Sequence, residues 1–155
     1  MMTIPSQSKS GQILIVDDDA EMRALLTDFF TNLGYQCLSF PLAKQALESL
    51  QNDPLLSQKT DVIISDIKMP QMDGLEFVSL VKKTFPDLPV ILITAFGSIE
   101  TAIEAIRLGA YDYIVKPFKL AEINVTVERA IEYRNLRKDN TMLRQEVKRS
   151  WSLDQ

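Results

Sequence analysis

The sequence predicts an α/β protein: a doubly wound parallel sheet of five strands with helices on both faces, followed by an extended C-terminal helix. Three observations support this prediction. Five short apolar runs alternate with segments in which apolar residues recur at helical spacing. Short connections containing Gly, Pro or Asp separate these segments, as is typical of parallel sheets. The length of 155 residues, 46% of them hydrophobic and 25% charged, suits one globular domain with an extension.

The first two strands and the helices that follow them have clear start and stop signals. The apolar run at residues 12–16 predicts the first strand. A helix with one apolar face begins at Ala20 and ends where Gly34 interrupts it. Residues 36–40 alternate enough for a second strand, and Pro41 opens the second helix.

The centre of the chain supplies the third strand, at residues 62–65, which are too few and too rich in β-branched side chains for a helix. We interpret residues 52–60, before this strand, as a loop. Asp73 is well placed to cap a helix over residues 74–85. The apolar run at residues 89–94 then predicts the fourth strand.

The last part of the chain completes the sheet and extends beyond it. Ser98 is a suitable N-cap for a helix that ends at Gly109. Residues 112–115 form the expected fifth strand. A final helix starts near Leu120 and meets no breaker before Ser150, so it is longer than a single domain requires.

Several function classes are excluded by residues that the sequence lacks. It contains no histidine, which removes Ser-His-Asp and Cys-His catalysis and His-ligated metals. None of its five glycines belongs to a nucleotide-binding G-x-G-x-x-G or G-x-x-x-x-G-K-[ST] motif. A single cysteine cannot form an internal disulfide and fits a reducing compartment. With no signal-like or membrane-length apolar segment, we expect a cytoplasmic protein that does not contact a membrane.

Charge is distributed unevenly along the chain. Residues 1–118 carry 9 Lys and Arg against 15 Asp and Glu, a net charge of −6, whereas residues 119–155 carry 8 against 6, a net charge of +2. The excess in the tail is small and interleaved with Glu. We therefore expect no direct DNA binding by this chain.

Chemically useful side chains follow the expected strands. Asp17 and Asp18 follow the first strand, Asp66 the third, Thr94 ends the fourth and Lys116 follows the fifth. In the strand order 2-1-3-4-5 the first and third strands are neighbours, so these groups converge at the carboxyl edge of the sheet. Asp66 has no evident structural role, because Asp73 already caps the next helix.

Three carboxylates so close together repel one another unless a cation neutralises them. Without histidine the ligands are all oxygen atoms, which favours a hard divalent ion, and Mg²⁺ needs only one or two carboxylates. A carboxylate nucleophile beside Mg²⁺, a lysine and a hydroxyl donor can perform phosphoryl transfer to aspartate.

These residues closely resemble the receiver domain of two-component response regulators. The motifs are Ile13 to Asp19, Asp66 to Pro70 with Asp73-Gly74, Thr94-Ala95 and Lys116-Pro117-Phe118. The resemblance covers about residues 12–133 and implies a flavodoxin-like sheet. It also implies that Asp66 accepts a phosphoryl group from the phosphohistidine of a sensor histidine kinase.

The resemblance implies a role for each of the other site residues. Asp18 and Asp66 would bind Mg²⁺ directly together with the Lys68 backbone carbonyl, and Asp17 would act mainly through water. Lys116 would pair with the phosphoryl group, and the bond between Lys116 and Pro117 is commonly cis in this family. Thr94 would turn its hydroxyl toward the phosphate, and Tyr113 would change its packing with it. The chain would be phosphorylated and dephosphorylated on Asp66 without being an enzyme in any other sense.

A switch also needs an element with two arrangements. We expect this element to be the surface formed by residues 98–133. Beyond it, five residues of the last helix follow the 3-4 spacing of a short coiled coil and would support a parallel homodimer. They are Tyr133, Asn140 and Val147 at a positions, and Leu136 and Leu143 at d positions. The alternative is a solvated helical extension.

The expected domain organisation has four parts. Residues 1–11 form a flexible N-terminal segment, 12–133 the receiver, 134–150 a helical linker or short coiled coil, and 151–155 a tail. Residues 97–102 and 109–113, with the Arg-, Glu- and Leu-rich tail, resemble the nitrogen-regulation type of activator, which has an AAA+ ATPase and a DNA-binding domain. Neither domain is expected here, so both an excised fragment and a stand-alone receiver remain open.

Two other functions are considered. A haloacid-dehalogenase-type phosphatase would use Asp17, the first residue of a D-x-D motif. That family needs an acidic pair beyond the lysine, however, and the first acidic residues after it are Glu122 and Glu128 of the expected last helix. An adaptor that only dimerises would carry three carboxylates at an electrostatic cost without using them.

Overall fold

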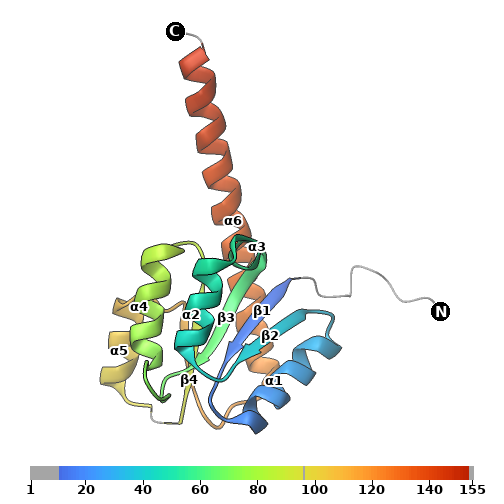
Figure 1. Ribbon diagram of the computed structural model, residues 1–155, viewed down its shortest axis with the longest axis vertical. Helices are drawn as coiled ribbons and strands as arrows, with labels where there is room; N and C mark the ends of the chain where they lie inside the picture. Colours follow the sequence, from blue (N-terminus) through green and yellow to red (C-terminus); the bar gives the residue numbers. More distant parts are fainter. Residues whose placement is uncertain (1–10, 96, 154–155) are drawn as a thin grey trace, which may run out of the picture.

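The computed structural model describes the backbone of residues 11–95 and 97–153 and the side chains of residues 11–95 and 97–138. Helices and strands alternate along most of the chain (Figure 1). In order they are β1 (Gln12–Val16), α1 (Ala20–Asn32), β2 (Gln36–Phe40), α2 (Ala43–Asn52), α3 (Pro54–Lys59), β3 (Thr60–Asp66), α4 (Gly74–Thr84), β4 (Val90–Thr94), α5 (Ile99–Arg107), β5 (Asp112–Val115) and α6 (Leu120–Leu153).

The sheet confirms the predicted topology. Its five strands are parallel and lie in the order β2-β1-β3-β4-β5. The strands β1, β3 and β4 are buried on both faces, which is why they appear in the sequence as continuous apolar runs.

Helices cover the two faces of the sheet in separate layers. On one face, Ile13 and Ile15 of β1 pack in a cluster with Phe30 of α1 and Val127 of α6. On the other face, Leu14 and Val16 pack in a cluster with residues of α2 and α4. Because neighbouring residues of one strand point to opposite faces, β1 contributes to both cores.

Side chains cap the starts of three helices, and the two caps expected from the sequence, Asp73 and Ser98, are confirmed. The side chain of Asp19 accepts hydrogen bonds from the Glu21 and Met22 N–H groups at the start of α1. Asp73 and Ser98 cap α4 and α5 in the same way.

The expected loop at residues 52–60 is wrong, because residues Pro54–Lys59 form the short helix α3. The Asp53 carboxylate accepts hydrogen bonds from the Leu55 and Leu56 N–H groups, and Pro54 occupies the first turn. A single turn and a half is too short to display apolar periodicity, so the sequence pattern did not indicate it. The second helix also begins later than expected, since Pro41 lies before it, Leu42 is its N-cap and α2 starts at Ala43.

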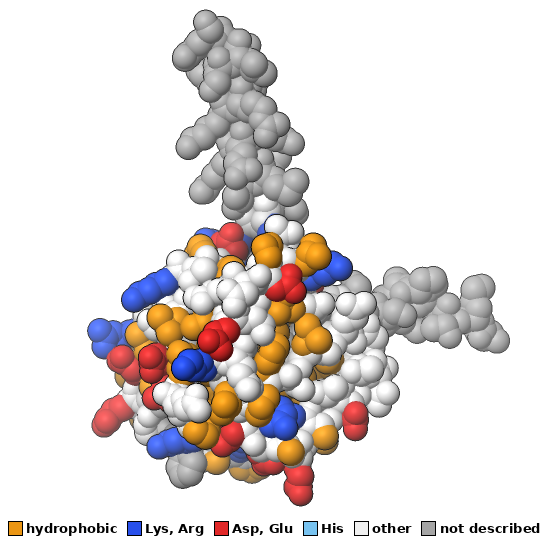
Figure 2. Space-filling view, viewed as in Figure 1, with side chains coloured by type: hydrophobic (Ala, Val, Ile, Leu, Met, Phe, Trp, Pro, Cys, Tyr) orange, Lys and Arg blue, Asp and Glu red, His pale blue; other side chains and the backbone are white. Residues whose placement is uncertain are grey.

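The last helix begins at the carboxyl edge of the sheet, crosses one face and projects past the amino edge (Figure 1). This confirms the predicted C-terminal extension. No helix in the described part of the chain combines the length and the apolar character needed to cross a membrane. On the face shown in Figure 2, acidic and basic side chains are interspersed among apolar ones.

Candidate functional site

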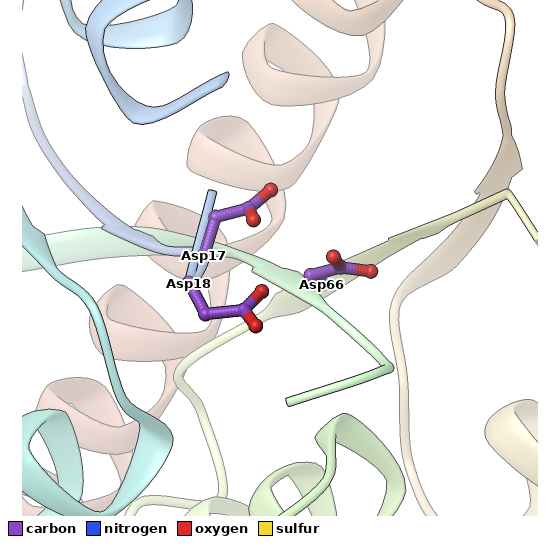
Figure 3. A group of neighbouring side chains, drawn as sticks. All are labelled: Asp17, Asp18 and Asp66. Carbon is purple, nitrogen blue, oxygen red and sulfur yellow. The ribbon is translucent and has the colours of Figure 1, made fainter. Parts of the chain in front are cut away.

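Three aspartates meet at the carboxyl edge of the sheet. Asp17 and Asp18 directly follow β1, and Asp66 is the last residue of the neighbouring strand β3. One carboxylate oxygen from each lies within 4.8 Å of the others. Figure 3 shows Asp17 and Asp18 extending from the same turn toward Asp66. The strand order therefore produces the convergence that the sequence predicted.

Burial makes it unfavourable for two of these carboxylates to carry charge. Asp17 is 2% exposed and Asp66 is 9% exposed, whereas Asp18 is exposed to solvent. The pKa of Asp17 is raised to about 6, mainly by burial and also by the neighbouring Asp66, against the opposing effect of the Asp19 N–H group. Burial also raises the pKa of Asp66, and this is partly offset by Lys116.

Lys116 provides the positive charge at the site. Its Nζ lies 3.7 Å from Asp66 Oδ2 and 4.0 Å from Asp17 Oδ2. The Lys116 N–H group donates to the Thr94 carbonyl at 2.8 Å, which fixes its backbone beside the end of β4. The peptide bond between Lys116 and Pro117 is cis, as the family resemblance implied.

The other predicted site residues lie on neighbouring elements. Thr94 is the fully buried last residue of β4, next to the strand that carries Asp66. Lys68 lies two residues after Asp66 and is exposed. Tyr113 of β5 is half-buried against the core cluster on the α2 and α4 face. Within the described part of the chain its buried hydroxyl makes no hydrogen bond.

Three supporting groups were not identified from the sequence. Arg23 of α1 donates from Nη1 to the Asp17 carbonyl at 2.7 Å. The Ile67 N–H group donates to Asp66 Oδ1 at 2.7 Å and so fixes the carboxylate. A Cβ at Gly74 would lie against the Asp66 carbonyl oxygen and 2.8 Å from the Ile67 Cα, so only glycine allows α4 this close. The first two depend on tertiary contacts, whereas the prediction from sequence used the Asp73-Gly74 pair only as a helix cap and as part of the receiver motif.

The donor set fits a hard divalent cation. All three converging side chains offer carboxylate oxygens, and burial and mutual repulsion make their charge costly without a cation. Oxygen ligands of this kind suit Mg²⁺, which binds one or two carboxylates and keeps open positions for phosphate oxygens. The site therefore combines an acidic cluster that could hold a metal ion with a lysine and a buried carboxylate.

The residues of the expected dimer helix are only partly described. The Tyr133 ring contacts Tyr111, with their centroids 5.5 Å apart, so this side chain packs against the body. Leu136 is 60% exposed. Asn140, Leu143 and Val147 lie outside the residues whose side chains are described.

Comparison with known proteins is consistent with this site. Residues 13–128 match the family model described as the response regulator receiver domain. The chain is 38% identical over 133 residues to the DNA-binding transcriptional regulator NtrC of Proteus hauseri, covering 85% of this chain and 27% of that protein. The crystal structure of NtrX from Brucella abortus is 34% identical, with a TM-score of 0.76 over 88% of this chain and 30% of that one.

A smaller structure is similar over nearly its entire length. The receiver domain protein from Clostridium thermocellum is 26% identical with a TM-score of 0.75, over 81% of this chain and 98% of that one. By contrast, this chain spans only 25–30% of the length of the curated regulators that it matches.

Proposed function

This chain belongs to the response regulator receiver domain family of two-component systems, and on that premise we propose that Asp66 accepts a phosphoryl group from the phosphohistidine of a sensor histidine kinase. Receiver domains act in phosphorylation-dependent signalling. The observation that carries the proposal is the position of Lys116 Nζ, 3.7 Å from Asp66 and 4.0 Å from Asp17, at the edge where three carboxylates converge.

The proposed reaction exchanges one bond to phosphorus for another. The phosphorus–nitrogen bond of phosphohistidine breaks while a carboxylate oxygen of Asp66 bonds to phosphorus, and the imidazole retains the electron pair and takes up a proton. Lys116 pairs with one phosphoryl oxygen and the Thr94 hydroxyl donates to another. The Ile67 N–H group holds the carboxylate in a single orientation.

In this proposal Asp18, Asp66 and the Lys68 backbone carbonyl hold Mg²⁺, and Asp17 acts mainly through water. When bound, the ion supplies positive charge that offsets the charge of the phosphoryl oxygens. Chemistry on the chain is limited to phosphorylation and dephosphorylation of Asp66. The comparisons give no support to the phosphatase alternative.

Phosphorylation with acetyl phosphate and Mg²⁺ tests the proposal. We expect the intact protein to gain the mass of one phosphoryl group, mapped to the peptide that contains Asp66, and Asp66→Asn to gain none. Asp28→Asn, on the exposed side of α1, is the control and should be labelled normally. Labelling of Asp66→Asn, or phosphate on Asp17, would show that the assignment is wrong.

We further propose that phosphorylation changes the surface formed by residues 98–133. Ile99, Ile103 and Ile106 of α5 are 52–81% exposed, which is unusual for three isoleucines on one helix. Nearby on β5, the Tyr113 hydroxyl is buried and makes no hydrogen bond within the described residues. A phosphate mimic such as beryllofluoride should change amide exchange across residues 97–133. Identical exchange with and without the mimic contradicts this proposal.

We infer an output in transcription regulation. The support is the similarity to a regulator described as DNA-binding and transcriptional, of which this chain spans 27%. The rest of that regulator lies outside the matched region, and this chain would act as a regulatory part. A homodimer through α6 would pass on the change.

A further inference from the structure

The long helix α6 contacts the body through three basic side chains where it passes the amino edge of the sheet. Arg134, Arg137 and Lys138 are spaced by three and four residues, which places them on adjacent positions of the same helical face. Each makes a polar contact with the rest of the domain. The partners lie at α3 and just before β3 and β4, on the opposite edge from Asp66.

Arg134 is the most buried of the three, with an exposed fraction of only 6%. Its Nη2 donates to the carbonyl oxygens of Ser57 at 3.1 Å and Gln58 at 3.4 Å. Its Nε lies 3.8 Å from Asp61 Oδ1. A guanidinium buried to this extent is tolerated only when such partners replace water.

The carbonyl partners belong to the last turn of α3, where helix carbonyls lack partners within the helix. Lys138 Nζ also donates to the Gln58 carbonyl, at 3.3 Å. Cations at the carboxyl end of a helix are favoured by its dipole. Thus α3 is capped at its start by Asp53 and at its end by side chains of α6.

One further contact fixes the same part of α6, and the carboxylate that faces Arg134 is itself held in place. Arg137 Nε donates to Asp87 Oδ1 at 2.9 Å, and its guanidinium lies 5.6 Å from the centroid of the Tyr133 ring. Asp61, which faces Arg134, accepts from the Gln12 N–H group at 2.9 Å through its other oxygen. The contacts therefore join α6 to the starts of β1 and β3 and to the segment before β4.

We propose that α3, Asp61 and Asp87 form a clamp that binds Arg134, Arg137 and Lys138 of α6. The clamp fixes the direction in which α6 leaves the receiver domain. The helix beyond the clamp then moves as one rigid unit with the receiver, and any rotation of the start of α6 is carried to its far end. The role of α3 is to supply the carbonyls of this clamp. The proposal does not depend on phosphorylation of Asp66.

Trp151, the only tryptophan, lies near the end of α6 and reports on this rigidity without labelling. Time-resolved fluorescence anisotropy is measured on the full chain, without phosphodonor or Mg²⁺, at a concentration where it is monomeric. The unmodified chain should show mainly the slow decay of the whole molecule. In the double variant Arg134→Met/Lys138→Met, a faster component of the anisotropy decay should appear. Exchange of the amides at the end of α3 should rise by on the order of tenfold, as expected for the loss of hydrogen bonds to charged groups.

Arg129→Met is the matched control, because Arg129 is exposed on α6 one turn before the clamp. It should leave both measurements unchanged. The single variant Lys138→Met alters a partly exposed side chain and should give a smaller change of the same sign. It replaces the double variant in the test if the double variant does not fold. A folded double variant with the anisotropy decay and α3 exchange of the unmodified chain would overturn the clamp. So would equal changes in Arg129→Met.

Discussion

Asp17 combines deep burial with an ionisable group, and this has a consequence for stability. Its pKa is about 6 in the folded protein and near 3.8 in the unfolded chain, so between these values the folded state binds more protons. The free energy of unfolding of the metal-free protein should therefore fall as pH rises through about 6. Asp17→Asn should remove the part of this fall that Asp17 causes, while Asp66 continues to contribute, and should stabilise the metal-free protein above pH 7 by at most about 3 kcal/mol, less the lost Lys116 contact.

Urea unfolding in a chelator at pH 5 and pH 8 measures this effect. The control is Asp28→Asn on the exposed face of α1, which should keep the pH dependence of the unmodified protein. Added Mg²⁺ should reverse the order, because the unmodified site gains binding energy that the Asp17→Asn site partly loses. If Asp17→Asn and the unmodified protein lose stability equally between pH 5 and pH 8, ionisation of Asp17 does not cause the loss of unfolding free energy.

Gly74 is constrained by the backbone of Asp66 and Ile67. A methyl group at this position would meet the Asp66 carbonyl oxygen and the Ile67 Cα, both of them backbone atoms that cannot move aside by a rotamer change. Gly74→Ala should cost about 1–3 kcal/mol of unfolding free energy and slow labelling of Asp66 by acetyl phosphate. Unchanged stability and labelling rate would show that α4 can move away at little cost.

At the level of secondary structure, the start of α5 depends on a single cap. Ser98 Oγ accepts from the Thr101 N–H group at 3.0 Å in an exposed position. Ser98→Ala should cost about 1 kcal/mol and raise amide exchange in the first turn of α5, whereas Ser98→Asp should preserve the cap. Hydrogen exchange by mass spectrometry distinguishes the two variants. Equal exchange in both would mean that tertiary contacts, not the cap, hold this helix.

Elements were predictable where burial or capping leaves a local signal. The strand β4, buried along its length, and the capped helices α1, α4 and α5 each have one. By contrast, α3 has six residues and no buried side chain, so no apolar pattern marks it. Its only local signal is its start at Asp53 and Pro54, and its contacts with α6 join residues far apart in sequence, such as Gln58 and Lys138. Local patterns cannot contain such information.

For the whole molecule, the topology explains why the site was predictable. Parallel strands place all their carboxyl ends on one edge, so residues as distant as Asp17, Asp66 and Lys116 converge once the strand order is known. Arg23 and Arg134 escaped prediction because each serves the structure by contacting a backbone carbonyl, which every residue has. The proposed domain limits at 12–133 and 134–150 remain predictions.

The proposed dimer is a property of the whole chain in solution. We expect the phosphorylated protein to be a dimer by light scattering at high micromolar concentration. Leu136→Lys should shift it toward monomer, because Leu136 is 60% exposed on α6 at a predicted d position. Leu55→Lys is the control, since Leu55 is 64% exposed on α3. A phosphorylated protein that stays monomeric, or equal effects of both variants, would contradict a coiled coil through α6.

The strand β3 has Asp61 near its beginning and Asp66 at its end, about 16 Å apart for an extended strand. A kinase that approaches Asp66 and a macromolecule that engages the far part of α6 would therefore occupy opposite poles of the receiver. Binding of the kinase would therefore leave the far part of α6 accessible. Phosphorylation by the kinase and binding of the macromolecule to α6 would then occur in one complex, without release of either partner between the two events.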